Sequence, residues 1–144
     1  MEFILDNMNE LNLWAVLVAA AVPFVVGFVW YDMKAGFGKR WAKLVGLSKK
    51  DIEKTDGMAM TFAVLAVFSL ATAVILACMM RVLDITGIYE SAVFGVIVGL
   101  VLRGGAHFIH NGFSKRPMEL TLLDAGHDMV SIVAMTVVLG LWAF

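Results

Sequence analysis

Apolar residues fall into four stretches of roughly twenty residues, and the segments between them carry most of the charge. A helix rises about 1.5 Å per residue and the hydrocarbon core of a bilayer is about 30 Å thick, so about 20 apolar residues span it. None of the four stretches alternates apolar and polar residues as a membrane strand would. The sequence therefore predicts one domain, residues 1–144, that is an all-α integral membrane protein. Its four transmembrane helices are expected over about residues 11–31, 58–80, 90–111 and 119–144.

The segment between the first two apolar stretches, about residues 36–56, has the pattern of a short amphipathic helix. Apolar residues recur at helical spacing among basic ones: Phe37, Trp41, Leu44 and Val45 among Lys39, Arg40 and Lys43. This pattern is typical of a helix that lies in the membrane interface. Ser48 and Asp51 have the spacing of a capping box, which predicts a second short helix. We interpret the segment as a basic loop that fixes topology, with an anionic-lipid site as the alternative.

Basic residues are gathered in two loops, residues 32–57 and 112–118. They are Lys34, Lys39, Arg40, Lys43, Lys49, Lys50 and Lys54 in the first loop and Lys115 and Arg116 in the second. On the other side of the predicted membrane lies Arg81, and the charged residues of the N-terminal tail there are all acidic. Because cytoplasmic loops carry an excess of Lys and Arg, we expect both basic loops in the cytoplasm and both termini outside.

The composition excludes an ordinary soluble domain. Hydrophobic residues make up 61% of the chain and charged residues 16%, whereas soluble domains are nearer about half apolar and about a quarter charged. The net charge of −1 gives no global field that would attract nucleic acid, so the expected partner is the lipid bilayer. The single cysteine, Cys78, excludes an internal disulfide and a cysteine-only metal site. The acidic start lacks the basic region of a signal peptide, so the first apolar stretch is expected to remain as an anchor.

Two stretches of the sequence resemble a known family. The first contains Gly27-Phe28-Val29-Trp30-Tyr31, Phe37-Gly38-Lys39, Trp41 and Leu44-Val45-Gly46. The second contains Asn111-Gly112-Phe113, Arg116-Pro117, Leu122, Asp124-Ala125-Gly126 and Leu139-Gly140-Leu141-Trp142. Together they resemble a bacterial domain-of-unknown-function family of small four-helix inner-membrane proteins, over nearly the whole chain. The resemblance implies the bacterial inner membrane, with the termini in the periplasm. That family has no agreed activity, so the resemblance assigns no role to any residue.

Polar residues are concentrated within the third and fourth predicted helices. They are Arg103, His107, His110, Asn111, Asp124, His127 and Asp128. Spacings of three and four place the first four on one face of helix three, and the last three, with Ser131, on one face of helix four. When two antiparallel helices are joined by a loop, two residues that face each other at the same depth in the membrane have position numbers whose sum is constant. Arg103 with Asp128, and His107 with Asp124, both give 231, so two complementary pairs are predicted to face each other.

A charge near the bilayer centre costs at least about 2.5–3.5 kcal/mol, so these polar residues need partners or a function. Three interpretations are open. In the first, the groups satisfy one another and only fasten the hairpin. In the second, they form a proton or ion pathway, with His107 and His127 as the groups that gain and lose a proton. In the third, a divalent metal such as zinc, iron or manganese binds to His107, His110, Asp124, His127 and Asp128. The spacing matches no established metal motif and Arg103 would repel a cation, so no cofactor is assigned.

No arrangement of residues in the sequence indicates catalysis. No serine has a partnered base, no glycine-rich phosphate loop follows a strand, and Cys78 has no histidine near it in the sequence. The leading expectation is therefore a transport-type or channel-like membrane protein rather than an enzyme. The alternatives are a non-catalytic scaffold or accessory subunit of another membrane protein, and a metal-binding membrane protein.

Small residues recur every four positions along the third predicted helix, at Ser91, Gly95 and Gly99. A stripe of this kind lets another helix approach closely, within the chain or between subunits. Because a protein of four helices leaves much surface for self-association, we expect a homo-oligomer in which this stripe lies near a subunit contact.

Overall fold

The described part of the chain is helical. The computed structural model describes residues 11–54 and 56–142, and this part contains helices and turns but no strand. The acidic tail at residues 1–10 and the predicted end of helix four at residues 143–144 lie outside the described residues. The prediction of an all-α fold is confirmed.

Four helices among the described residues are long and apolar enough to cross a membrane. They are α2 (Leu13–Trp30), α5 (Met58–Val82), a continuous segment from Gly87 to Phe113, and α8 (Met118–Trp142). The third of these consists of α6 (Gly87–Ile97), a π-helical segment η1 (Val98–Gly104) and α7 (Gly105–Phe113). The sequence therefore predicted all four spans, with boundaries shifted by a few residues.

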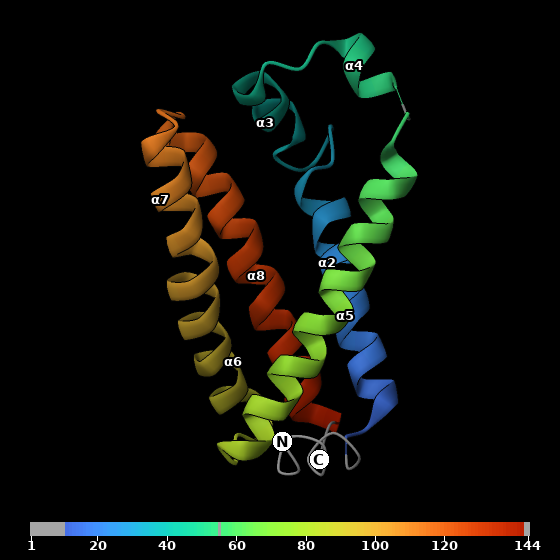
Figure 1. Cartoon of the computed structure of the whole chain (residues 1–144), viewed down its shortest axis with the longest axis vertical. Coiled ribbons are helices and arrows are strands. Elements are labelled where there is room, and N and C mark those ends of the chain that lie inside the picture. Colours follow the sequence, from blue (N-terminus) through green and yellow to red (C-terminus); the bar gives the residue numbers. More distant parts are fainter. Residues whose placement is uncertain (1–10, 55, 143–144) are drawn as a thin grey trace.

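The helices run up and down between two ends of the molecule (Figure 1). At one end the described ends of the chain meet, because the Asn12 side chain caps α2 and also donates a hydrogen bond to the carbonyl of Trp142 at 3.0 Å. At the other end lie the turn between α7 and α8 and the short helices α3 (Gly38–Val45) and α4 (Lys49–Glu53). The two basic loops therefore share one end of the bundle, as the charge pattern requires.

The amphipathic segment after α2 forms the two short helices that its pattern predicts. Gly46 ends α3 in the left-handed conformation, with φ of 79°, which glycine adopts without a steric penalty. Ser48 and Asp51 form the predicted capping box at the start of α4. Two Arg40 side-chain nitrogens, Nε and Nη2, donate to the Glu119 carboxylate, so α3 is fastened to the first turn of α8. This contact holds α3 over one end of the bundle.

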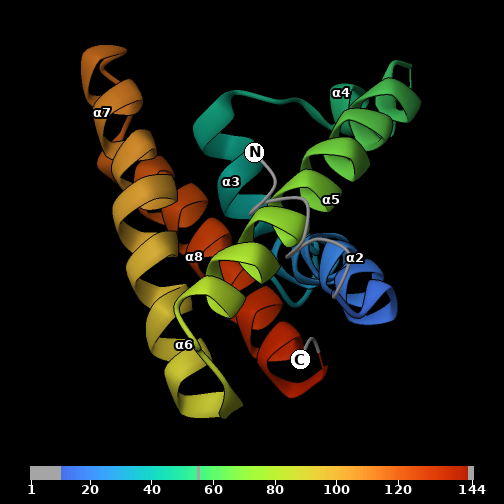
Figure 2. The same ribbon diagram turned by 60° about the horizontal axis from the view of Figure 1, so that its bottom comes forward.

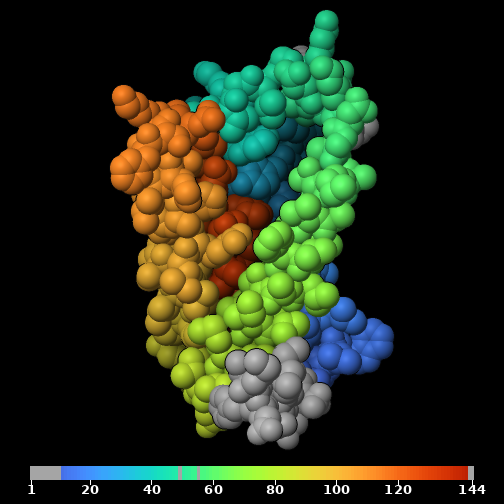
Figure 3. Space-filling view, in the orientation of Figure 1, coloured from blue at the N-terminus to red at the C-terminus, as the bar shows by residue number. Residues whose placement is uncertain are grey.

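The packed core lies in the half of the bundle nearer the described ends of the chain. It is built from the first half of α2 and the second halves of α5 and α8, and its most buried members are Ala15, Ala19, Ala73, Ala77, Met80, Met135 and Leu139. Alanine lets helix backbones approach closely, which is how helices associate in a bilayer. Toward the α3 end, α5 diverges from α7 (Figure 2). A hollow opens there between α5 and α7, with α8 visible in its floor (Figure 3).

The small-residue stripe of α6 and η1 packs against α8 of the same chain, which is the first of the two contacts that the sequence allows; a homo-oligomer stays a prediction. A Cβ added at Gly95 would lie 2.7 Å from the Cα of Val133, and one added at Gly99 would lie 3.0 Å from the Cα of Met129. Ser91 is fully buried, and its Cβ would lie 2.9 Å from one added at Gly140. Backbone-to-backbone contact along this seam is what the small side chains allow.

The third spanning helix contains a π-helical segment that its sequence did not predict. Within Val98–Gly104 the backbone bonds skip one residue more than in an α-helix, and the N–H of Gly105 bonds to the carbonyl of Leu100. Such segments are frequent at functional sites. Arg103 lies in this segment, so the change of helix type directly sets the direction of its side chain.

Candidate functional site

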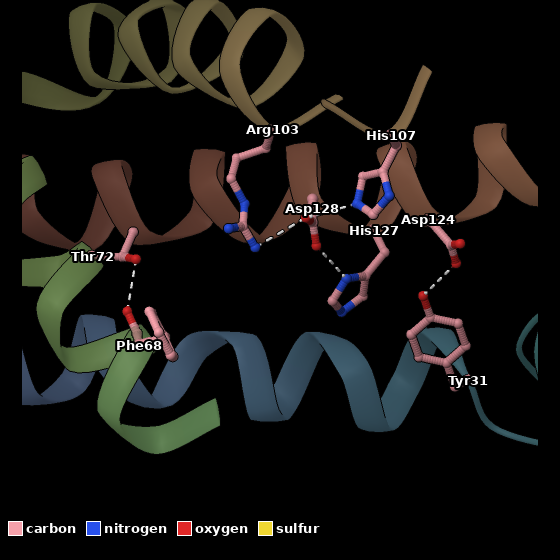
Figure 4. A network of polar contacts seen from close by, with 8 residues as sticks. All are labelled: Tyr31, Phe68, Thr72, Arg103, His107, Asp124, His127 and Asp128. Carbon is pink, nitrogen blue, oxygen red and sulfur yellow. Dashed lines mark hydrogen bonds and ion pairs between the residues drawn. The ribbon is translucent and has the colours of Figure 1, made fainter. Parts of the chain in front are cut away.

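Asp128 of α8 is the centre of the polar contacts within the bundle (Figure 4). Its Oδ2 forms an ion pair with Arg103 Nη2 at 3.0 Å and accepts a hydrogen bond from His107 Nε2 at 3.1 Å. Its Oδ1 accepts from His127 Nδ1 at 3.0 Å. We call these four residues the Asp128 cluster. The predicted pairing of Arg103 with Asp128 is present in the structure.

The exposed fractions of the four side chains differ in a way that bears on their mobility. Asp128 and His127 are largely enclosed, with 16% and 15% of their side chains exposed. Arg103 is 57% exposed, because its guanidinium reaches from η1 toward the hollow between α5 and α7. The cluster therefore joins one enclosed carboxylate to a cation whose side chain is more than half exposed.

His127 has one ring nitrogen committed and one without a partner. Its Nδ1 donates to Asp128, which assigns the proton of the neutral ring to Nδ1 and leaves Nε2 as a lone-pair acceptor. Nε2 is buried and has no hydrogen-bond partner among the described residues. It faces α2, where a Cβ added at Gly27 would lie 3.5 Å from it. The ring centroid lies 5.1 Å from that of Tyr31 and 6.3 Å from that of Trp30. His127 thus holds an unpartnered ring nitrogen against an aromatic wall.

Asp124 forms its hydrogen bond with Tyr31, the residue directly after α2, rather than with a histidine. Tyr31, which follows α2, donates its hydroxyl to Asp124 Oδ1 at 3.2 Å. Burial and the neighbouring Asp124 carboxylate raise the pKa of the Tyr31 hydroxyl well above its ordinary value, so the hydroxyl stays protonated and remains a donor. No ion pair between described residues involves Asp124.

The predicted pairing of His107 with Asp124 is wrong, since His107 bonds to Asp128 instead. The constant-sum argument places the Cα atoms but ignores the tilt of helical side chains toward the N-terminus of their own helix. In an antiparallel pair the two side chains therefore lean past each other. His107 leans toward the depth of Asp128, and Asp124 leans away toward Tyr31. The extra residue per turn in η1 moves His107 in the same direction.

Two residues of the predicted cluster take no part in these contacts. His110 is exposed, and within the described chain its side chain makes no hydrogen bond or ion pair. Asn111 uses its backbone carbonyl to accept from the N–H of Arg116, while its side-chain Nδ2 is buried without a partner. Ser131 is also buried with an unpartnered hydroxyl, and it lies one turn beyond Asp128. The predicted face of helix three is therefore only half used.

Two cavities meet at the Asp128 cluster. The larger, which we call the aromatic cavity, has a volume of about 790 Å³ and extends toward α3. Its aromatic lining consists of Phe24, Phe28, Tyr31, Trp41 and Phe62, and its polar lining of His107, Asp124, His127 and Asp128. The smaller, which we call the small cavity, has a volume of about 80 Å³ and is lined in part by Ser69, Thr72, Arg103, Asp128 and Ser131. Both share the walls made by Pro23, Leu65, His127 and Asp128, so the cluster separates the two spaces.

Comparison with known protein families gives a match from residue 14 to residue 140, to the family described as Protein of unknown function (DUF1761). The chain belongs to this family. The match reaches from the first turn of α2 to the last turn of α8, and the prediction of a domain-of-unknown-function family is confirmed. No curated protein and no solved structure matches the chain. The chemistry of the site in this DUF1761 member must therefore be derived from its geometry.

The geometry gives no support to a metal site in this family member. The described residues contain no group of three or more His, Cys, Asp or Glu side chains arranged to hold a metal ion. Of the five predicted ligands, His110 is exposed and Asp124 is bonded to Tyr31. The other three are His107, His127 and Asp128, and the Asp128 carboxylate is already paired with Arg103.

The sequence interpretation missed the residues that α2 and α3 contribute to the site. Neither Tyr31 nor Trp41 was assigned to the site, yet both line the aromatic cavity, and Tyr31 holds Asp124. Their rings are in contact with each other, with centroids 5.3 Å apart. The available signal was their clustering within eleven positions of one another, next to a glycine-rich turn. Nothing in the sequence alone showed that this turn folds back over α8.

Proposed function

We propose that the protein is a transport-type membrane protein in which the Asp128 cluster takes up and releases a proton. The observation that supports this most is one enclosed carboxylate that holds a permanent cation and two imidazoles between two cavities. Ionisable residues inside a membrane are rare and commonly mark proton relays and substrate pathways. Imidazole is the side chain that gains and loses a proton near neutral pH.

The proposed step uses the free nitrogen of His127. A proton added at Nε2 converts the ring to an imidazolium, whose charge Asp128 already faces through Nδ1. Before that step, the two charges of Arg103 and Asp128 cancel, and the histidines are neutral. After it, the cluster carries one positive charge. Arg103 can then move away from Asp128, because its side chain is more than half exposed to the hollow. Proton uptake thereby changes the position of a charged side chain.

Along the length of the bundle, access to the cluster is open from the α3 end. The aromatic cavity reaches the cluster from the α3 end. The small cavity on the other side of Asp128 is mostly apolar, but it has the hydroxyl residues Ser69, Thr72 and Ser131 in its wall and room for several water molecules. Beyond it, the packed core of α2, α5 and α8 closes the bundle toward the described ends of the chain. A purely structural ion pair does not require a cavity on each side. One-sided access is the arrangement that a transport-type protein has in one of its states.

The orientation and assembly of the protein belong to the same proposal. The family resemblance favours the bacterial inner membrane, and the charge pattern favours an orientation with loops 32–57 and 112–118 in the cytoplasm. The aromatic cavity would then open toward the cytoplasmic side. A homo-oligomer stays a prediction, but its contact would use a face other than Ser91, Gly95 and Gly99, because these pack on α8.

A scaffold or accessory role is the second candidate function, and one observation favours it. Arg103 and Asp128 join η1 to α8, and Arg40 and Glu119 join α3 to α8. Both ion pairs therefore fasten elements to the same helix. In this function the Asp128 cluster would be structural, and no proton would cross the membrane through it.

Proton flux into liposomes separates the two functions. Purified protein is reconstituted with a trapped pH-sensitive dye, and flux is driven by a potassium diffusion potential. Asp128→Asn retains the shape of the side chain and removes its charge, and Asp56→Asn makes the same change at an exposed position in the loop before α5. We expect flux in the wild type and in Asp56→Asn, and loss of flux in Asp128→Asn. Wild-type flux in a well-folded Asp128→Asn variant would exclude the cluster as the coupling element. A folded wild type without flux would favour the scaffold.

A further inference from the structure

We propose that the aromatic cavity binds a monovalent, amphipathic organic cation. This inference rests on the proposed transport function, for which it names the substrate class, and its experiment measures binding without flux. Three features of the cavity support it: the sign of the charges in its wall, the kind of apolar surface, and its size.

The charges in the wall favour a cation. Asp124 and Asp128 line the aromatic cavity, and no lysine or arginine is among its lining residues in the described chain. Arg103 neutralises Asp128 from the side of the small cavity. Asp124 has the Tyr31 hydroxyl as its hydrogen-bond partner and is in no ion pair between described residues. A carboxylate inside an apolar region is costly without a counter-charge. A bound cation beside Asp124 would supply it.

The apolar surface is aromatic where it lies near this carboxylate. Tyr31 and Trp41 meet edge to face, with an interplanar angle of 62°, and the Tyr31 ring also holds Asp124 through its hydroxyl. Phe24 of α2 and Phe62 of α5 are stacked at 6.3 Å along the same cavity. The faces of aromatic rings attract organic cations, and Trp and Tyr do so more strongly than Phe. A small hydrated metal ion would gain little from such walls, because it requires oxygen ligands.

The size of the cavity selects among cations. Its volume of about 790 Å³ falls within the range of about 300–1,000 Å³ that is usual for sites of drug-sized ligands. Residues of α5, α7 and α8 line the cavity, and Figure 3 shows a hollow between α5 and α7 with α8 in its floor. An amphipathic cation concentrates in the membrane interface and could enter from there. The occupant is therefore a hydrophobic amine or quaternary ion with one positive charge and an apolar body.

Binding of tetraphenylphosphonium tests the proposal directly. The full-length protein in nanodiscs of zwitterionic lipid is equilibrated by dialysis against this cation, and protein-free nanodiscs give the background. Tetraphenylborate has the same shape and a negative charge, so it is the matched ligand. Asp124→Asn retains an acceptor for Tyr31 and removes the charge, and Asp56→Asn is the matched variant in an exposed loop.

We expect tetraphenylphosphonium to bind the wild type and Asp56→Asn equally, and Asp124→Asn at least about tenfold more weakly. Trp41→Leu should weaken binding more than Trp41→Phe, because the phenyl ring retains part of the cation attraction. Binding of tetraphenylborate to the same extent would overturn the proposal, as would equal binding of the cation to a folded Asp124→Asn variant. Cation binding without proton flux would refute the proposed transport function and leave this site standing. Flux without cation binding would refute the substrate class alone.

Discussion

Replacing Gly95 by alanine tests the closest approach of two helices in the bundle. The added Cβ would lie 2.7 Å from the Cα of Val133 and closer still to Thr136 Oγ1. Carbon atoms attract each other best at about 3.5–4.0 Å, so α6 and α8 must separate by about 1 Å. Thr136 cannot turn aside freely, because it is fully buried and donates to the carbonyl of Val133 at 2.9 Å. The strain therefore falls on the backbones.

The expected destabilisation follows from two opposing effects. Extra volume in a packed interior typically costs about 1–3 kcal/mol. Alanine is also a better helix former than glycine, by about 0.8–1.0 kcal/mol. Gly112 lies in α7 with open space around its added Cβ, so Gly112→Ala has the gain in helix formation without the clash. The difference between the two variants isolates the clash, and we expect Gly95→Ala to be less stable than Gly112→Ala by about 1–3 kcal/mol.

The measurement is reversible unfolding in mixed micelles, with the SDS fraction raised stepwise and helicity followed by circular dichroism. The wild type and both glycine variants are compared at equal protein concentration. If Gly95→Ala unfolds at the same SDS fraction as Gly112→Ala, the two helices do not touch at this position. In that case the register between α6 and α8, and with it the depth of Arg103 relative to Asp128, would be wrong.

Three further predictions concern the site and the topology. Arg103→Met alone should destabilise the protein by about 3 kcal/mol, which is the lower end of the range for buried ion pairs, because Arg103 is partly exposed. Adding Asp128→Leu should restore much of the lost stability, because no unpaired charge then remains. A double variant as unstable as Arg103→Met would contradict this prediction. The Tyr89→Phe substitution leaves Tyr31 as the tyrosine whose ionisation is measured by ultraviolet absorbance. Its tyrosinate should appear above the usual pH of about 10, because burial and Asp124 raise the pKa of Tyr31. Ionisation near pH 10 would mean that the Tyr31 hydroxyl is solvated. A reporter active only in the cytoplasm should be silent when fused to the C-terminus, and activity there would reverse the assigned topology.

The sequence predicted the helices and the seam between two of them because both depend on local composition and regular geometry. The predicted sum of 231 for residues at equal depth also describes Ser91 with Gly140 and Gly99 with Ile132, which meet across the seam. It describes Arg103 with Asp128 as well. Each of these pairs joins two antiparallel helices, where position in the sequence largely determines depth.

The site was predicted less completely because it depends on contacts between segments far apart in the sequence. Tyr31 bonds to Asp124 across ninety-three positions, and no local pattern encodes that contact. The π-helical segment was not predicted because Gly104 and Gly105 permit it without requiring it. His107 was assigned the wrong partner since its direction depends on that segment and on the tilt of side chains along the helix.

The concentration of packing in one half of the bundle has a consequence for how the protein tolerates substitution. In the second half of α5, Ala73 and Ala77 are fully enclosed, so each added methylene meets a neighbour at once. In the first half of the same helix, Phe62 and Leu65 border an open space, where a larger or smaller side chain displaces no packed atom. In a library that randomises α5, selection for stable protein should therefore depend strongly on side-chain volume near Met80 and only weakly on it near Met58. The tolerance of α5 to changes in side-chain volume would therefore differ between its two halves, with the boundary at the depth of Asp128.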